Sequence, residues 1–281
     1  MTQIVAPTHP FDAAVELASE GGSPDAFRGH TSAAYANMVG PFGGITAATL
    51  LSAVQQHPDC LGDPLSLTVN YAGPIADGEF EIAAHPTRTN RSTQHWNIEL
   101  IQDGVVITTA TAVFGNRRDT WSSTEIAAPS APAFDDVAAQ AFPDFIAWAR
   151  NYELRFVEGA VPNPEDDAAG SDLAQPSSTS TLWIRDNPPR PLDFPGLTAL
   201  CDVFYPRAFL RLGRYLPAGT VSLTVYFHAD AAMLAAQADD AVLGTARAQR
   251  FGNGYFDQSG EIWGRDGVLL ATTHQLVYFK D

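Results

Sequence analysis

The sequence contains the same series of segments twice, and this repetition restricts the possible folds more than any other feature. Ser66–Tyr71 reads SLTVNY, and Ser222–Phe227 reads SLTVYF. Further along each half, Asp103–Phe114 reads DGVVITTATAVF, and Asp266–Phe279 reads DGVLLATTHQLVYF. Because the order is the same in both halves, the sequence indicates an internal duplication of one structural unit.

Each copy has the sequence pattern of one helix and several strands. A segment that opens with glycine precedes each SLTV motif, at Gly44–Val54 and Gly196–Gly213, and we predict that both are helical. Thr220–His228 alternates apolar and polar side chains as a half-buried strand does, which places Thr220 on the same face as Ser222. The Asp-Gly pair that opens the last segment of each copy predicts a hairpin turn. Each copy is therefore predicted to contain one helix and four or five antiparallel strands.

The duplication predicts two units joined by a linker, with the boundaries 1–115, 116–145 and 146–281. The linker is rich in alanine, proline and serine, and it is predicted to contain a short helix around Asp135–Ala141. In the second unit, two strand-like runs, Tyr152–Val157 and Thr179–Arg185, flank an irregular stretch at Glu158–Ser178. The proline and acidic residues of that stretch are typical of an exposed loop.

The composition indicates a globular protein with an acidic surface. Hydrophobic residues make up 45% of the 281, and the formal net charge is −16, which would repel nucleic acid and anionic lipid. No apolar run approaches the roughly 20 residues of a membrane span, and the N-terminus lacks the basic start of a secretory signal. Cys60 and Cys201 are expected to be free thiols in a reducing compartment, and neither has metal-site spacing with a histidine. We therefore expect a cytoplasmic protein without a metal, another cofactor, a nucleic-acid partner or a membrane span.

A helix wrapped by an antiparallel sheet, present twice in one chain, resembles the double hotdog fold, an α+β architecture. The details resemble the acyl-CoA thioesterase II group from about Phe27 to Phe279. The segments that carry this resemblance are Val39–Gly44, Ser66–Tyr71, Arg88–Ser92, Leu197–Phe204, Gly219–His228 and Ala271–Phe279. Their order and spacing together are the evidence, since no single segment is a strict signature. The resemblance implies hydrolysis of acyl-CoA thioesters by direct attack of water.

The resemblance also implies a catalytic set in the second copy. Members of the group use an aspartate on the second helix, a threonine or serine at the start of the following strand, and a glutamine on the last strand. The matching residues in this chain are Asp202, Thr220 and Gln275. We expect Asp202 to accept a proton from the attacking water or to align it, and the other two residues to orient that water.

Comparison of the two copies supports the same positions without the family. The helices were aligned by their opening glycines, the SLTV strands by their motif, and the last strands by their Asp-Gly pairs. Each member of the set then stands opposite an apolar residue of the first copy: Asp202 opposite Leu50, Thr220 opposite Pro64, and Gln275 opposite Ala112. The second copy is therefore predicted to carry the chemistry, and the first copy to support it.

Each of these assignments has a structural alternative. Asp202 could lie on an exposed stripe of its helix, and Gln275 could be an ordinary buried glutamine bonded to the backbone. Thr220 could be a plain strand residue, with Ser222 supplying the hydroxyl instead. Pro206 follows Asp202 by four residues and is predicted to interrupt the helix, because the Asp202 carbonyl then loses its usual hydrogen-bond partner.

Three further residues are predicted to bind the substrate. Gly43 and Gly44 open the first helix, whose N-terminus offers free N–H groups and a positive dipole to a developing negative charge. Glycine also lets a ligand approach the backbone closely. Arg91, in the segment RTNRS, is the third residue.

Two other functions remain open from the sequence. A protein of this fold could bind acyl groups or lipids without turning them over, although the intact polar set argues against a passive binder. It could also hydrate an enoyl-CoA, but hotdog hydratases use an aspartate with a histidine a few residues away, and none follows Asp186 closely. The resemblance implies an acyl-CoA as the substrate partner, and members of the group often assemble into homo-oligomers.

Overall fold

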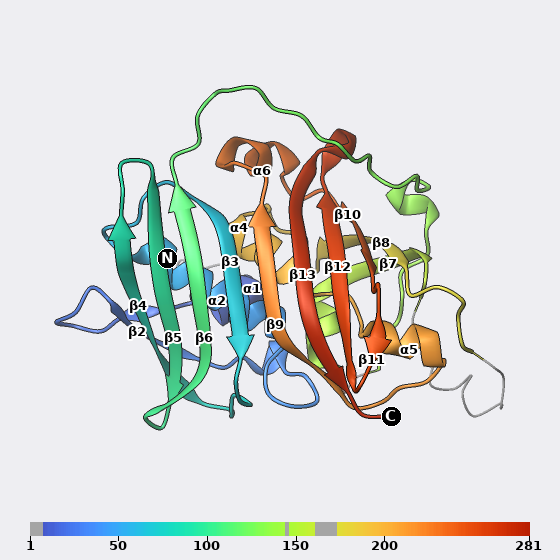
Figure 1. Cartoon of the computed structure of the whole chain (residues 1–281), viewed down its shortest axis with the longest axis horizontal. Helices are drawn as coiled ribbons and strands as arrows, with labels where there is room; N and C mark the ends of the chain where they lie inside the picture. The colour runs from blue at the N-terminus through green and yellow to red at the C-terminus, as the bar shows by residue number, and fades with distance from the viewer. Residues whose placement is uncertain (1–7, 144–145, 161–172) are drawn as a thin grey trace, which may run out of the picture.

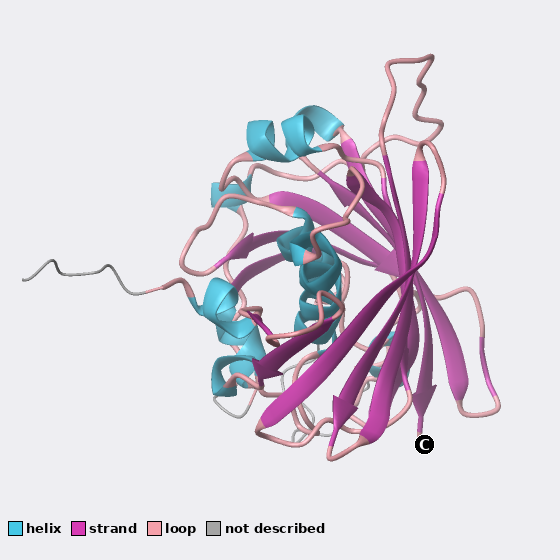
Figure 2. Cartoon of the chain, turned by 90° about the vertical axis from the view of Figure 1, so that its left-hand side faces the viewer, coloured by secondary structure: helices cyan, strands magenta, loops and turns pink. Residues whose placement is uncertain are grey.

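The strands form one large curved sheet, and the main helices lie on its concave side. The computed structural model describes residues 8–143, 146–160 and 173–281. The sheet has 13 strands, and each pair of neighbouring strands is antiparallel. Figure 1 shows the sheet from its face, and Figure 2 shows it curving around the helices.

The elements follow one another as predicted for two strand-rich units. The helices and 3-10 turns are α1 (Pro10–Ala14), η1 (Ala33–Tyr35), α2 (Gly43–Gln56), η2 (Phe134–Asp136), η3 (Ala147–Asn151), α4 (Phe194–Leu200), α5 (Arg207–Leu212), α6 (Ala231–Gln237) and η4 (Arg265–Gly267). The strands are β1 (Ala18–Ser19), β2 (Ala26–His30), β3 (Asp63–Tyr71), β4 (Glu79–Thr89), β5 (Thr93–Gln102), β6 (Val105–Gly115), β7 (Tyr152–Glu158), β8 (Ser180–Asp186), β9 (Ala218–Phe227), β10 (Val242–Arg247), β11 (Phe251–Gly252), β12 (Tyr255–Trp263) and β13 (Leu269–Phe279).

The strand order shows the duplication directly. In the first half it is β2-β4-β5-β6-β3, and in the second half it is β8-β10-β12-β13-β9. Each strand of one series therefore has a counterpart in the other. Three strands lie outside these series: β1 and β7 at the two edges of the sheet, and the short β11, which pairs with β12.

The two halves meet where the SLTV strands, β3 and β9, pair with each other. The register pairs Ser66 with Tyr226, Thr68 with Thr224, and Asn70 with Ser222. Equivalent residues thus exchange places about the central threonines, whose Oγ1 atoms are 3.0 Å apart. This is the relation that a two-fold axis produces between identical subunits, found here inside one chain.

Helix α2 is the central helix of the first half. Its sequence, GGITAATLLSAVQQ, is apolar or small on every side, and all residues from Gly44 to Val54 are buried. A helix that is apolar all round belongs in a protein interior. Thr49 and Ser52 remain satisfied there because their hydroxyls donate to the carbonyls of Ile45 and Ala48, at 2.8 and 2.9 Å.

The helical segment predicted at Gly196–Gly213 is two helices. Helix α4 ends at Leu200, and α5 begins at Arg207 with Pro206 as its N-cap. The interruption expected at Pro206 is therefore present, and it extends over residues 201–206. The segment between the two helices is the one that contains Asp202.

Other details differ from the sequence predictions. The linker helix around Asp135–Ala141 is reduced to the single turn η2, because the Gln140 N–H donates to the Leu154 carbonyl of β7 instead, at 2.8 Å. The turn at residues 103–104 is a tight two-residue hairpin, whereas the one at 266–267 is part of a longer connection that contains η4. Residues 161–172 of the predicted loop lie outside the described residues.

Both cysteines are free, with Cys60 partly exposed and Cys201 buried. Burial raises the pKa of Cys60 to about 11, so this thiol is protonated at neutral pH. Within the described ranges, no helix has the length and apolar character needed to cross a membrane.

Candidate active site

Asp202, Thr220 and Gln275 are far apart in the sequence, but hydrogen bonds join them in the structure. Gln275 Nε2 donates to Asp202 Oδ1 at 2.9 Å, and Thr220 Oγ1 donates to Gln275 Oε1 at 3.2 Å. Gln275 is buried on β13, Thr220 lies near the start of β9, and Asp202 lies in the turn after α4. The Gln275 carboxamide therefore links the carboxylate to the hydroxyl. The catalytic roles of the three residues stay a prediction.

A β-bulge brings Thr220 to the core face of the sheet. Ser222 pairs with an exposed residue of β13, but the next pair joins Thr220, not Val221, to the buried Val277. The extra residue, Val221, shifts the alternation of faces by one position. The prediction that Thr220 and Ser222 share a face is therefore wrong, and Thr220 shares a face with Gln275. The geometry thus favours Thr220 over Ser222 as the hydroxyl of this cluster.

The first copy contains the same bulge without the polar residues. In β3 the register shifts at Leu65, one residue after Pro64. Beyond the bulge, the leucine of the SLTV motif pairs with Ala112 in the first copy and with Gln275 in the second. Pro64 and Ala112 are therefore the structural counterparts of Thr220 and Gln275, as the alignment of the sequence motifs indicates.

Asp202 lies against the N-terminus of α2, so the first half also contributes to the cluster. The Gly44 backbone N–H donates a hydrogen bond to the Asp202 carboxylate. A β-carbon on Gly43 would lie only 2.7 Å from Asp202 Oδ2, so glycine leaves room for the carboxylate. The positive end of a helix also favours a negative charge at this point.

Burial nevertheless raises the pKa of Asp202 to about 7, against the lowering effect of the hydrogen bonds from Gln275 and Gly44. A carboxyl group with a pKa near the working pH is well suited to proton transfer. It is ionised in a large fraction of molecules, and it is basic enough to accept a proton from water during attack.

Gly44 has a further structural reason to lack a side chain. A β-carbon at this position would lie 2.7 Å from the Ala199 carbonyl oxygen of α4 and 2.5 Å from the Phe42 ring. The two central helices therefore approach each other closely at this glycine. The Gly44 N–H, predicted to face the substrate, is directed at Asp202, so the role that the geometry supports is to hold the carboxylate.

Tyr71 is a member of the cluster that the sequence comparison did not identify. Its hydroxyl donates to the Gly43 carbonyl at 2.8 Å and so anchors the start of α2. Burial, together with the nearby charge of Asp202, raises the pKa of Tyr71 well above its ordinary value. Its counterpart in the SLTVYF motif is Phe227, which has no hydroxyl. A search for residues that are polar only in the second copy therefore does not find Tyr71.

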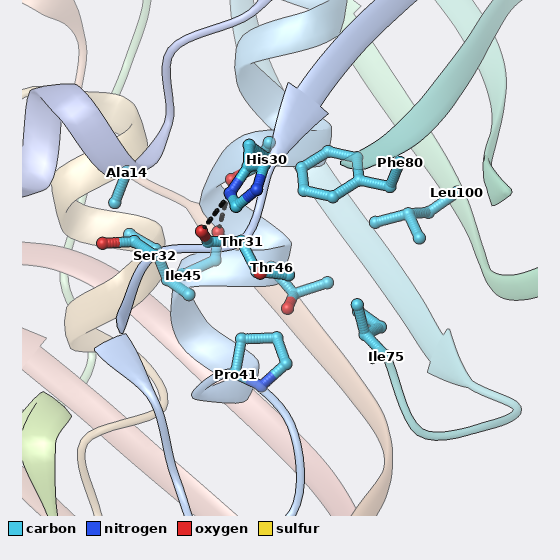
Figure 3. A pocket seen from close by; sticks show the side chains of 11 residues that line it. Ala14, His30, Thr31, Ser32, Pro41, Ile45, Thr46, Ile75, Phe80 and Leu100 are labelled. Carbon is cyan, nitrogen blue, oxygen red and sulfur yellow. Dashed lines mark hydrogen bonds between the residues drawn. The ribbon is translucent and has the colours of Figure 1, made fainter. Parts of the chain in front are cut away.

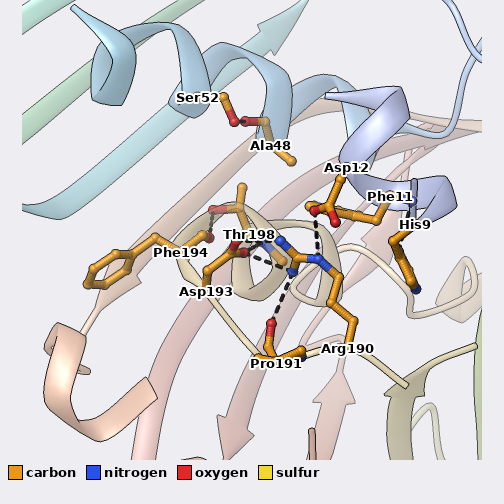
Figure 4. A network of polar contacts seen from close by, with 11 residues as sticks. His9, Phe11, Asp12, Ala48, Ser52, Arg190, Pro191, Asp193, Phe194 and Thr198 are labelled. Atoms are coloured by element: carbon orange, nitrogen blue, oxygen red, sulfur yellow. Dashed lines mark hydrogen bonds and ion pairs between the residues drawn. The ribbon is translucent and has the colours of Figure 1, made fainter. Parts of the chain in front are cut away.

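A polar network fixes the start of α4 and hence the turn that carries Asp202 (Figure 4). Asp193 is the N-cap of the helix, and its Oδ1 accepts a hydrogen bond from the Gly196 N–H at 2.8 Å. Arg190 contacts both carboxylate oxygens of Asp193 and donates from Nε to Asp12 Oδ1 at 2.8 Å. Because Asp12 belongs to α1, the network ties the N-terminal segment to the second half.

Within one chain, the structure does not bring Arg91 to the cluster. Arg91 lies in the exposed turn before Thr93, which pairs with Gly115 at the end of β6. Gly115 pairs in turn with Asp63 at the start of β3, whereas the cluster lies beside Tyr71 at the other end of that strand. The nine residues of β3 separate these ends by about 25–30 Å.

A hollow lies beside α2 (Figure 3). It is lined by Ala14, His30, Thr31, Ser32, Pro41, Ile45, Thr46, Thr49, Ile75, Phe80 and Leu100. Six of these eleven residues are apolar, and the hydroxyls of Thr46 and Thr49 bond back to carbonyls of their own helix. None of the three predicted catalytic residues lines the hollow, so we do not place the reaction there.

The cluster is made of carboxylate, amide and hydroxyl groups. In the part of the chain that the structure describes, no group of three or more histidine, cysteine, aspartate or glutamate side chains could hold a metal ion.

Comparison with known proteins identifies the class of this fold and then its family. A solved hot dog fold protein of unknown function from Alicyclobacillus acidocaldarius is 49% identical, and the match covers 98% of this chain and 99% of that one with a TM-score of 0.91. The predicted double hotdog fold is thus confirmed. The model of the acyl-CoA thioesterase N-terminal domain matches residues 32–115, and that of the C-terminal domain matches residues 127–279. The chain belongs to the acyl-CoA thioesterase family.

More distant solved structures share the fold. An acyl-CoA thioesterase II from Mycobacterium marinum is 19% identical, with 96% of this chain and 98% of that chain covered and a TM-score of 0.74. A tesB protein from Mycobacterium avium subsp. paratuberculosis has the same identity and coverage, with a TM-score of 0.75. No curated protein matches the sequence of this chain.

Proposed function

We propose that this protein hydrolyses acyl-CoA thioesters to the free acid and coenzyme A, by direct attack of a water molecule held by Asp202, Thr220 and Gln275. The observation that carries the proposal is the hydrogen-bonded chain of these three side chains on a family member's fold. The first copy has Leu50, Pro64 and Ala112 at the equivalent positions, so we propose one such site in each chain.

Asp202 is the proposed base. Water attacks the thioester carbonyl carbon as Asp202 takes one of its protons, and a new C–O bond forms. When the tetrahedral intermediate collapses, the C–S bond breaks and coenzyme A leaves as a thiolate. A thiolate is a good leaving group, so the reaction needs no strong general acid. The proton on Asp202 then returns to the thiolate or to solvent.

Gln275 and Thr220 are proposed to orient the attacking water. A carboxamide has two N–H donors, and Asp202 uses one of those of Gln275. The second remains for the water. Thr220 holds the carboxamide in this orientation, because its hydroxyl donates to the oxygen of Gln275. The proposed role of Gly43 and Gly44 is to keep the end of α2 small, so that Asp202 and the thioester can approach it.

The test is release of free thiol from a panel of acyl-CoAs of different chain length, with Asp202→Asn as the comparison. We expect release by the wild-type protein and little by the variant. Release from no member of the panel, combined with measurable acyl-CoA binding, would support a non-catalytic acyl-binding protein instead. Loss of the conjugated absorbance of an enoyl-CoA without thiol release would indicate a hydratase.

A further inference from the structure

A second glutamine stands beside Gln275 on the neighbouring strand. Gln258 of β12 is the direct partner of Gln275 of β13 in the sheet register. Both side chains are buried, with exposed fractions of 1% and 3%. Directly opposed residues of an antiparallel pair project to the same face and lie about 5 Å apart. Gln258 therefore flanks the proposed water site.

Arg207 fixes the orientation of the Gln258 carboxamide. Arg207 Nε donates to Gln258 Oε1 at 3.0 Å, and a guanidinium has only donors. The amide oxygen must therefore face Arg207, and the NH₂ group must point the other way. Gln258 Nε2 is buried and has no hydrogen-bond partner among the described residues. A buried donor without a partner is destabilising, and an acceptor that arrives with a ligand would satisfy this one.

Arg207 is a buried cation that forms no ion pair with a described carboxylate. Its exposed fraction is 0%, and its other hydrogen bonds go to the neutral oxygens of Tyr205, Ser178 and Ser180. In the described ranges, no carboxylate forms an ion pair with it. Burial lowers the pKa of Arg207 to about 9, so the group is still positively charged at neutral pH. An unbalanced buried cation favours negative charge that develops nearby.

Comparison of the two copies distinguishes Gln258 in the same way as Gln275. In the first copy, Trp96 pairs with Ala112, as Gln258 pairs with Gln275 in the second. Gln258 is therefore another position that is apolar in the first copy and amide-bearing in the second. The first copy has its own buried glutamine, Gln94, but both ends of that carboxamide are satisfied by protein groups.

We propose that the Gln258 side-chain N–H binds the thioester carbonyl oxygen and stabilises the negative charge that this oxygen gains when water attacks, with Arg207 as its positioning residue. This inference rests on the proposed thioesterase function. Gln258 would supply the hydrogen-bond donor to the thioester oxygen, because the Gly44 N–H at the end of α2 already donates to Asp202. The hydrogen bond from the cation polarises the amide and so strengthens its N–H as a donor.

The test compares Gln258→Met with Gln94→Met, two buried substitutions of similar shape in equivalent strands. Removing one donor to a developing oxyanion lowers kcat by roughly 10²–10³-fold, and we expect that loss for Gln258→Met with KM changed by less than about threefold. Gln94→Met removes satisfied hydrogen bonds, so it should lower the melting temperature more while leaving kcat per folded molecule close to that of the wild type. Circular dichroism measures the folded fraction of each variant.

The role of Arg207 is tested by a double-mutant cycle. Arg207→Lys should lower kcat in the wild-type background and have no further effect on kcat in the Gln258→Met background, because it acts through Gln258. Inhibition by a trifluoromethyl ketone analogue of an acyl-CoA tests the role of Gln258 by a measurement that does not depend on Arg207→Lys. Water adds to the carbonyl carbon of such a ketone, and the hydrate carries an oxyanion once Asp202 has taken a proton from it. Gln258→Met should therefore weaken its binding as much as it lowers kcat.

The outcomes separate the two proposals. Absence of thiol release by the wild-type protein would remove the thioesterase function itself. An active wild type, with a Gln258→Met variant that keeps kcat and analogue affinity within about threefold, would overturn the role of Gln258 and leave the function in place. Additive losses in the cycle would overturn the positioning role of Arg207.

Discussion

The two halves of this protein share a strand order and a bulge, but only one of them has polar groups at the equivalent points of its core. In the first half, α2 runs unbroken past Leu50, and Pro64 and Ala112 occupy the strand positions that correspond to Thr220 and Gln275. In the second half, the helix stops at Leu200, and the turn that follows carries Asp202. The comparison teaches that the scaffold itself does not require these polar groups. Their presence in one half is therefore evidence for a function rather than for the fold.

The sharpest way to break this comparison is to substitute the helix position in each half. Asp202→Asn keeps the shape but removes the proposed base, and we expect kcat to fall by about 10²–10⁴-fold. Leu50→Ala removes a fully buried side chain, so it should lower the free energy of unfolding by roughly 2–5 kcal/mol while thiol release per folded molecule persists. Initial rates and denaturant unfolding curves measure the two effects. If Leu50→Ala lowers the activity per folded molecule as much as Asp202→Asn does, the proposed division into a catalytic half and a supporting half is wrong.

The pH dependence of activity sharpens the role of Asp202. Only its ionised form can accept a proton, and its pKa is about 7. We therefore expect kcat to rise about tenfold per pH unit below 7 and to level off above it. A rate profile measured from pH 5 to 9 tests this, and a plateau down to pH 5 would contradict the assignment.

Asp186 provides the matched control for that profile, because burial raises its pKa to about 7 as well. For both residues the folded pKa lies above the unfolded value of 3.8, so their contribution to stability is complete below pH 3.8 and is lost as the pH rises to about 7. Either Asp→Asn variant should lose less stability than the wild type between pH 4 and 7. Only the Asp202 variant should also lose the pH limb of kcat.

The bulge gives a smaller test within the second half. Thr220→Val removes the hydroxyl that holds Gln275, and loss of one neutral hydrogen bond predicts a fall in kcat of about two- to tenfold. Ser222→Ala should change kcat by less than about twofold, since Ser222 is on the other face of β9. Steady-state rates of both variants decide between the hydroxyls. The reverse order of effects would mean that the bulge is not kept in solution.

The smallest expected effect belongs to Arg91. Because the first half supports the cluster through the end of α2 and not through its β4–β5 turn, Arg91→Ala should leave kcat/KM within about twofold of the wild type. A marked rise in KM that depends on the nucleotide part of coenzyme A would show that this turn contacts the substrate after all. That comparison uses acyl-CoA and the matching acyl-pantetheine.

Much of the fold can be predicted from the sequence, because matching motifs in the two copies identify equivalent elements. The SLTV motifs predict β3 and β9, and the alternation of polar and apolar residues predicts their faces up to the bulge. The bulge itself has no signal, since Val221 is an ordinary strand residue. Strict alternation therefore places Thr220 on the wrong face, although the alignment of motifs finds its counterpart correctly.

The residues in and around the cluster that sequence reasoning missed depend on contacts between distant segments. Tyr71 contributes from the first copy, so a search for polar residues in the second copy does not find it. Gln258 is the counterpart of Trp96, but this becomes clear only when β12 and β5 are aligned by their pairing with β13 and β6. Arg207 reads in sequence as a surface residue of a helix, and only the packing of α5 against the sheet reveals that it is buried.

The pairing of β3 with β9 has a consequence for how the cluster responds to dilution. Gly44 comes from one half and Asp202 from the other, and the two are parts of the same polypeptide. A site shared between separate subunits comes apart when the protein falls below the dissociation constant of its complex. Here the partners keep a fixed effective concentration, whatever the amount of protein in solution. The contact between them should therefore persist in a single isolated chain.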